Sequence, residues 1–156
     1  MKNSIEAKLK EMGMELPAVA KPVAAYVPAV RTGAFVYTSG QLPFSSGELA
    51  YKGKVGKDCT PEDAQAAAKI CALNCLAAIK EQIGSLDKIE RIVKVLGFVN
   101  CVDTFTMQPK VVNGASEFLR ELFGDKGLHA RSAVGVSSLP MDSPVEVEMI
   151  VQFSVT

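Results

Sequence analysis

Residues 129–149 read HARSAVGVSSLPMDSPVEVEM, and this stretch contains two strand-like runs that each hold a charged side chain. In the first run Arg131 precedes small and β-branched residues, which are typical of a half-buried strand. In the second run Glu146 and Glu148 alternate with apolar residues as far as Phe153, so both carboxylates lie on one face of the strand. Charged side chains are uncommon in apolar strands, and this pair predicts a functional site.

The composition predicts one domain. The chain has 156 residues, 48% of them hydrophobic, which is enough to bury a sizeable core. Its 17 basic and 17 acidic residues cancel, so we expect small molecules or other protein chains as partners rather than nucleic acid or a membrane surface. No apolar run approaches the roughly 20 residues of a membrane-spanning helix, and residues 1–17 form a polar amphipathic segment without a signal-peptide core. These features predict a cytoplasmic location.

The four cysteines fit a reducing compartment. Cys71 and Cys75 are four residues apart on a predicted helix, but no histidine or further cysteine pair lies at ligand spacing, so we expect no metal site. Together with Cys101 they are expected to be small buried hydrophobic residues. A reactive Cys59 thiolate, stabilised by the N-terminus of the following helix, is the less favoured alternative for that residue.

The succession of patterns predicts an α+β fold. Thr60 supplies a hydroxyl N-cap, Pro61 suits the first helical turn, and Gly84 suits a helix end, so we expect a helix between them. A second helix is expected where apolar residues recur at helical spacing before Gly124. The expected elements, in chain order, are strands 25–30 and 34–39 with a turn at 31–33, a possible short strand within 44–58, helix 60–83, strand 89–100, helix 108–123, strand 131–137 and strand 145–155.

The expected elements form a mixed sheet. Strand 89–100 is rich in Ile, Val, Leu and Phe, and is expected to be a central strand buried on both faces. The helix between it and strand 131–137 implies a crossover that makes these two strands parallel. Both helices would then cover one face of the sheet, leaving the other face exposed in a monomer. Such an exposed face predicts oligomerisation.

Several motifs in the same order resemble the Rid (YjgF-like) family of reactive-intermediate deaminases. The most specific of them is the stretch from Ala130-Arg131-Ser132-Ala133-Val134 through Leu139-Pro140 to Val145-Glu146-Val147. Other landmarks agree, namely Tyr26 in AYV, the run Thr38-Ser39-Gly40-Gln41-Leu42-Pro43, and Val112-Asn113 leading into Phe118. The resemblance covers roughly residues 24–155, which makes residues 1–22 an N-terminal extension of a single Rid-like domain spanning residues 1–156.

The resemblance implies a chorismate-mutase-like α+β fold, with two helices on one face of a mixed sheet. It also implies a homotrimer in which the exposed sheet faces pack inward and three clefts lie between neighbouring subunits. Members of the family hydrolyse reactive enamines and imines such as 2-aminoacrylate to a 2-oxo acid and ammonia. This chemistry requires neither a metal nor an organic cofactor.

The resemblance also assigns roles to residues. Arg131 would hold the substrate carboxylate through two parallel hydrogen bonds, a geometry that lysine cannot reproduce. Glu146 would orient water and relay a proton, with Glu148 on the same strand face as the alternative acid. Tyr26 would pack over the substrate and offer a hydroxyl, and Ser39 and Gly40 would bring hydrogen-bonding groups close to it. Asn113 would contact the same site, although exposure to solvent explains its position nearly as well.

Some features depart from the family pattern and indicate a divergent branch. Besides the N-terminal extension, residues 104–110 are longer than the corresponding turn of compact members. Ala133 stands where several members have cysteine, and Gly135 and Ser138 replace larger polar residues, which would reshape the cleft. His129 is the single histidine of the chain, and we expect a structural or surface role for it.

Two other functions stay open. One is a noncatalytic trimer that binds or senses a small carboxylate through Arg131. The other is the ribonuclease activity attributed to parts of the family, which the zero net charge and the lack of a strip of aromatic and basic residues disfavour.

Overall fold

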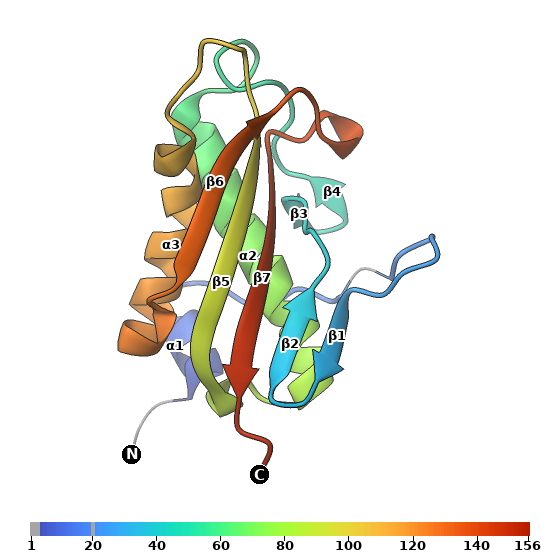
Figure 1. The fold of residues 1–156 in the computed structure, drawn as a ribbon, viewed down its shortest axis with the longest axis vertical. Helices are drawn as coiled ribbons and strands as arrows, with labels where there is room; N and C mark the ends of the chain where they lie inside the picture. The colour runs from blue at the N-terminus through green and yellow to red at the C-terminus, as the bar shows by residue number, and fades with distance from the viewer. Residues whose placement is uncertain (1–3, 20) are drawn as a thin grey trace.

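The computed structural model describes residues 4–19 and 21–156, in which a five-stranded sheet carries its helices on one face (Figure 1). The strand order is β1-β2-β7-β5-β6, and a separate small hairpin is formed by β3 and β4. The predicted α+β class with a mixed sheet is therefore confirmed. The helices and strands are α1 (Ile5–Glu11), β1 (Ala29–Thr32), β2 (Phe35–Thr38), β3 (Phe44–Ser45), β4 (Glu48–Leu49), α2 (Pro61–Ile83), β5 (Ile89–Asn100), α3 (Gln108–Phe123), β6 (Ala130–Val136) and β7 (Val145–Phe153), with short 3-10 turns η1 (Leu86–Lys88), η2 (Gly124–Gly127) and η3 (Pro140–Asp142).

Both predicted long helices are confirmed at the predicted ends. The Thr60 hydroxyl accepts a hydrogen bond from the backbone N–H of Asp63, 3.1 Å away, and so caps the start of α2. Gly84 ends α2 with a φ of 85°, a conformation that glycine adopts without strain. Helix α3 turns one apolar face toward the sheet, with Phe118 and Leu122 buried on it.

Strands β5 and β6 are parallel, as the intervening helix α3 predicted. Strand β5 lies inside the sheet between β7 and β6, as expected of a central strand, but the expectation that residues 89–100 are buried on both faces is wrong. Strand β7 is central, between β2 and β5, and only the helix-covered face of β5 is buried. On its other face Leu96 and Phe98 are partly exposed because no element of the same chain covers them.

The first hairpin is shifted from its predicted position. Strand β1 begins at Ala29 rather than residue 25, and the turn lies at Gly33 and Ala34 rather than at residues 31–33. Thr32 pairs with Phe35, so the loop has two residues, and Gly33 takes the positive φ of 54° that such tight loops require.

The N-terminal segment contains a helix that the sequence pattern did not predict. The Ser4 hydroxyl caps α1, and Leu9 is buried with 1% of its surface exposed. Glu6 lies 3.4 Å from the ammonium of Lys80 on α2, and the backbone N–H of Ile5 donates to Asp87. Helix α1 thus packs on the helix layer as a third, short helix (Figure 1). None of the described helices is both long enough and apolar enough to span a membrane.

The second face of the sheet is open and partly apolar, as expected. The side chains of Val30, Phe35, Tyr37 and Val134 are between 37% and 52% exposed on this face. Monomeric proteins seldom expose a contiguous apolar patch of this kind, so the face is suited to contact with another chain.

Helices α2 and α3 cross closely because a glycine lies at the crossing. A Cβ on Gly114 of α3 would overlap the carbonyl oxygen of Gln65 on α2 and lie 2.8 Å from its carbonyl carbon. Since both of those atoms belong to the backbone, no side-chain rotation could relieve the overlap. Gly114 therefore sets the distance between the helices.

We expect Gly114→Ala to lower the free energy of unfolding by about 1–3 kcal/mol. The free-energy cost of the steric overlap should exceed the stabilisation that alanine provides through its higher helix propensity. Denaturant unfolding at one fixed protein concentration measures this change in the free energy of unfolding. Glu121→Ala, on an exposed position of the same helix, is the control and should change the value by about 0.5 kcal/mol or less. A Gly114→Ala protein as stable as the parent would contradict the close crossing.

Candidate functional site

The residues predicted for the site fall into two groups. Arg131 and Asn113 meet on the helix-covered side of the sheet, where Ser116 and His129 join them in what we call the Arg131 cluster. Ser39, Gly40 and Glu146 lie together at the start of β7, and we call them the Glu146 cluster. The sequence analysis placed Arg131, Asn113, Ser39, Gly40 and Glu146 in one site and did not separate them into two groups.

Arg131 is held by neutral oxygen acceptors. Its Nη1 donates to Oδ1 of Asn113 at 2.7 Å and to the hydroxyl of Ser116 at 3.2 Å. Both acceptors lie on α3, three residues apart and hence on one helix face. The solvent-exposure explanation of Asn113 is wrong, because its side-chain oxygen binds Arg131.

One edge of the Arg131 guanidinium is left for a ligand. A guanidinium has N–H groups on Nε and on both Nη atoms, and the two bonds to α3 both come from Nη1. Among the described residues no hydrogen bond to Nε or Nη2 is found. The Nε and Nη2 donors form the parallel pair that matches the two oxygens of a carboxylate.

A cavity of about 270 Å³ opens beside Arg131. It is lined by Ser116, Glu117, Arg120, Gly127, Leu128, His129 and Arg131. Two guanidinium groups and one carboxylate border it, so the cavity is suited to a small anion.

Glu146 packs directly against Gly40. A Cβ on Gly40 would overlap Oε1 of Glu146 and lie 2.8 Å from its Cδ, so only glycine leaves the carboxyl in this position. The bridge between Gln41 and Val147 holds the two segments side by side, with backbone hydrogen bonds of 2.8 and 3.1 Å. Gly40 and Glu146, both predicted for the site, are thus in direct contact.

The environment of Glu146 makes its carboxyl less acidic. Burial raises the pKa of this half-buried side chain above the usual value, and the negative charge of Glu148 on the same strand face raises it further. A carboxyl with a raised pKa exchanges protons more readily near neutral pH, which suits a general acid or base.

Ser39 of the Glu146 cluster contacts the segment that contains Tyr26. The Ser39 hydroxyl donates to the carbonyl oxygen of Val27 at 2.6 Å, so it holds the backbone beside Tyr26 rather than pointing a free hydroxyl at a ligand. Tyr26 is 58% exposed. Its ring is available to a ligand or to another chain, and no hydrogen bond joins it to Glu146 within the described part of the chain.

The two clusters face opposite sides of the sheet. Arg131 pairs with Val95, which is buried under the helices, whereas Glu146 pairs with Phe98 on the open face. Partner residues on neighbouring strands point to the same face. Val95 and Phe98 are also about 10 Å apart along β5, at roughly 3.3 Å per residue. One chain therefore does not bring Arg131 and Glu146 onto the same ligand.

The cysteines do not form a reactive or metal-binding site. The alternative of a reactive Cys59 is wrong, because burial raises the pKa of its thiol to about 11. Cys71 and Cys75 are fully buried, as expected, and their thiols donate to the carbonyl oxygens of Val145 and Val147, on either side of Glu146. Among the described residues no group of three or more His, Cys, Asp or Glu could hold a metal ion.

Gly135 does not widen a cleft on the helix side of β6. A Cβ there would lie 2.8 Å from Nε2 of Gln108 and 3.0 Å from the sulfur of Cys101, so these side chains fill the space that a larger residue would occupy. Gln108 begins α3, and its amide also donates to the carbonyl of Phe105 at 2.8 Å.

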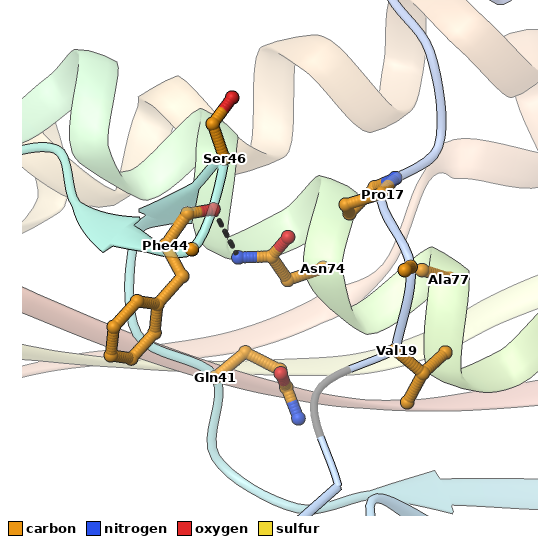
Figure 2. Close-up of a pocket in the computed structure, with 9 residues that line it drawn as sticks. Pro17, Val19, Gln41, Phe44, Ser46, Asn74 and Ala77 are labelled. Atoms are coloured by element: carbon orange, nitrogen blue, oxygen red, sulfur yellow. Dashed lines mark hydrogen bonds between the residues drawn. The ribbon is translucent and has the colours of Figure 1, made fainter.

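A second cavity, of about 220 Å³, lies under the N-terminal segment (Figure 2). Figure 2 shows Asn74 of α2 donating a hydrogen bond to the carbonyl oxygen of Phe44, at 3.1 Å. The side chains of Val19 and Gln41 border the same space. None of the described residues that line this cavity is charged, so they do not supply the cation that a carboxylate would require.

Ser116 and His129 were not recognised as part of the site from the sequence. The available signal was the three-residue spacing of Asn113 and Ser116, which places them on one face of a helix. His129 could not be linked to them, because the contact forms only when η2 folds back against α3.

The burial of Glu146 predicts how this residue affects the stability of the protein at different pH values. Because its pKa is raised in the folded state, ionisation of this carboxyl opposes folding at neutral pH. We expect Glu146→Gln to raise the free energy of unfolding at pH 7 by about 0.5 kcal/mol or less, since solvent screens a half-exposed group. The gain should vanish near about pH 3.5, where Glu146 is protonated in both states.

Urea unfolding at the two pH values measures this difference. Glu90→Gln makes the same chemical change at an exposed position of β5 and serves as the control. If Glu146→Gln stabilised the protein equally at both pH values, packing rather than ionisation would be the cause.

Comparison with known proteins identifies the family of the chain. Residues 6–153 match the family model described as "YjgF/chorismate_mutase-like, putative endoribonuclease". The match begins inside residues 1–22, the segment that we predicted to be an extension.

Curated relatives cover most of the chain. Protein TCP17 of Trypanosoma cruzi is 40% identical over 151 residues, which are 96% of this chain and 94% of that protein. A 2-iminobutanoate/2-iminopropanoate deaminase of Dermatophagoides farinae is 30% identical over 135 residues, 86% of this chain and 91% of the deaminase.

Solved structures share the fold. A protein of unknown function from Agrobacterium tumefaciens is 45% identical, with a TM-score of 0.91 over 96% of this chain and 92% of its own. Escherichia coli TdcF with bound serine is 26% identical, with a TM-score of 0.62 over 87% of this chain and 94% of its own.

Proposed function

The chain belongs to the YjgF/chorismate mutase-like family, also called the Rid family, and we propose that it hydrolyses reactive enamines and imines such as 2-aminoacrylate to a 2-oxo acid and ammonia. The observation that carries this proposal is the Arg131 guanidinium, which α3 holds through Nη1 while its Nε and Nη2 edge is left for a carboxylate. The deaminase from Dermatophagoides farinae gives the proposal independent support.

The proposed reaction needs positioning and proton transfer. Protonation of the terminal carbon of 2-aminoacrylate gives the iminium, and water then adds to the carbon that bears nitrogen. Transfer of one proton from the added water to nitrogen makes ammonia the leaving group, and loss of the remaining hydroxyl proton to a base as the C–N bond breaks leaves the 2-oxo acid. Glu146 is the proposed group that orients the water and relays the proton, and its raised pKa supports that role.

The proposed site is completed by a second copy of the chain. Within one chain Arg131 and Glu146 face opposite sides of the sheet, and the open face exposes apolar side chains. A homotrimer would bury that face and bring the Arg131 cluster of one subunit against the Glu146 cluster of the next. Three equivalent clefts would result, with Tyr26 and Asn113 at their borders.

None of these steps calls for a metal or an organic cofactor. Small carboxylates are therefore the proposed ligands, and nucleic acid and membranes are not proposed partners. A cytoplasmic location remains our prediction.

Endoribonuclease activity is a second candidate because the matched family model carries that description. The balanced charge of 17 basic and 17 acidic residues gives it little electrostatic support. RNA binding that weakens steeply with salt would favour it over deamination.

We expect the protein to accelerate release of the 2-oxo acid from freshly generated 2-aminoacrylate, and Arg131→Ala to reduce kcat/KM by about 10- to 100-fold, the value of a charge-assisted pair. Arg131→Lys should recover little, since lysine cannot form the bidentate pair. Arg91→Ala, at an exposed position of β5, is the matched control.

Rates equal to the uncatalysed background for both the parent and Arg131→Ala would overturn deamination of this substrate. Tight binding of pyruvate without turnover, measured by calorimetry, would instead identify a noncatalytic carboxylate-binding trimer.

Mixing of inactive subunits tests the shared cleft. We expect Arg131→Ala and Glu146→Gln each to keep at most about a tenth of the parent activity alone, and their co-expressed mixed trimers to recover up to about one third of it. Each mixed trimer holds one cleft in which an intact Arg131 faces an intact Glu146. Differently tagged subunits allow mixed trimers to be purified, and sedimentation gives their mass.

Mixed trimers without activity would show that both residues act within one chain. A protein that sediments as a monomer would contradict the shared cleft directly.

A further inference from the structure

His129 is connected to Arg131 through one hydroxyl group. Nε2 of His129 lies 2.9 Å from the Ser116 hydroxyl, and that hydroxyl accepts a hydrogen bond from Nη1 of Arg131 at 3.2 Å. On the other side of the ring, Nδ1 of His129 lies 2.7 Å from the carbonyl oxygen of Gly127. The four groups form an unbroken chain from η2 to the candidate carboxylate site.

The direction of each hydrogen bond follows from its partners. The Gly127 carbonyl can only accept, so Nδ1 of His129 carries a proton. In the neutral ring Nε2 is then an acceptor, and the Ser116 hydroxyl donates to it. This orientation turns the lone pairs of the Ser116 oxygen toward Arg131, which always donates.

The carbonyl at the end of the chain is held firmly. A Cβ on Gly127 would overlap the carbonyl oxygen of Leu119 and lie 2.8 Å from its carbonyl carbon, so the Gly127 backbone packs tightly against α3. Lys126, next to it, donates to the carbonyl oxygen of Ile89 at 3.1 Å and ties η2 to β5. Such a fixed acceptor can hold the imidazole in one tautomer.

We propose that His129 is a positioning residue that orients the Arg131 guanidinium through Ser116, and that protonation of His129 is coupled to carboxylate binding at Arg131. The inference rests on the proposed function, because it assigns regulation by pH to the same carboxylate site. It contradicts our expectation that His129 has only a structural or surface role.

The surrounding charges determine the sign of the coupling. Arg131 from β6, together with Arg120 and Glu117 from α3, lines the same cavity as His129, while Lys126 of η2 points to Ile89. Burial lowers the pKa of His129, the hydrogen bond to Gly127 opposes that shift, and the charge of Arg131 lowers the pKa further.

A carboxylate bound to Arg131 would offset the positive charge that lowers the pKa of His129. Ligand binding should therefore raise the pKa of His129 and, by reciprocity, the ligand should bind more tightly when His129 is protonated. At a separation of about 7 Å in a water-like dielectric, the expected effect is about threefold in Kd.

The test uses the fact that the chain has a single histidine. Long-range ¹H–¹⁵N spectra of the full-length protein report the tautomer and pKa of His129 without any assignment step. We expect an Nδ1–H neutral ring, and a higher pKa in the presence of pyruvate, the 2-oxo acid that 2-aminoacrylate yields. Calorimetry should show pyruvate binding about threefold more tightly below the pKa of His129 than above it.

Variants separate the roles of the groups. His129→Gln keeps an acceptor for Ser116 but cannot titrate, so pyruvate binding in this variant should lose the share of its pH dependence that belongs to His129. Any pH dependence caused by Glu146 would remain in that variant. Ser116→Ala should weaken binding and uncouple the His129 pKa from pyruvate, whereas Ser45→Ala, an exposed hydroxyl on β3, should change neither.

The outcomes distinguish the two proposals. Pyruvate binding that leaves the His129 pKa unchanged would overturn the coupling while the proposed function stands. Absence of pyruvate binding at every pH would overturn the coupling, whereas the turnover assay with 2-aminoacrylate decides the proposed function. Unchanged affinity in Ser116→Ala would show that Ser116 does not orient Arg131.

Discussion

Neighbouring residues of a β-strand point to opposite faces, and in this chain only one of those faces is covered. Helices α2 and α3 bury one side of the sheet, so alternate residues of β7 belong either to the core or to an open surface (Figure 1). Glu146 follows this alternation onto the open face, while Arg131 on β6 turns toward α3. The separation of the two charges within one chain is thus a direct result of the pleat and of the one-sided helix layer.

Local patterns in the sequence were sufficient to predict most of the framework. The cap at Thr60, the glycine at 84 and the alternation from Val145 to Phe153 all depend on neighbouring residues, and each was confirmed. The position of β7 at the centre of the sheet depends on pairing with β2, which no local pattern encodes. Helix α1 was likewise missed, because its stability comes from burial of Leu9 against the other helices.

The same distinction applies to the candidate site. The motifs around Arg131 and Glu146 could be recognised from sequence, and they are the residues on which the proposed chemistry depends. Ser116 and His129 could not be recognised in this way, because they join the Arg131 cluster only after α3 and η2 pack against β6. The division of the residues between two faces was also hidden, since the direction of Arg131 depends on its register with Val95.

The partners of Arg131 explain why it is suited to bind an anion. Asn113 and Ser116 are neutral acceptors, so they fix the guanidinium while its full positive charge remains available to a ligand. A carboxylate in their place would neutralise that charge and compete with the substrate for the same donors. Because Glu146 is distant from Arg131 within the chain, its carboxylate does not neutralise the guanidinium. For the same reason Arg131 does not lower the pKa of Glu146. Within one chain both groups thus keep the charge states that the proposed chemistry uses.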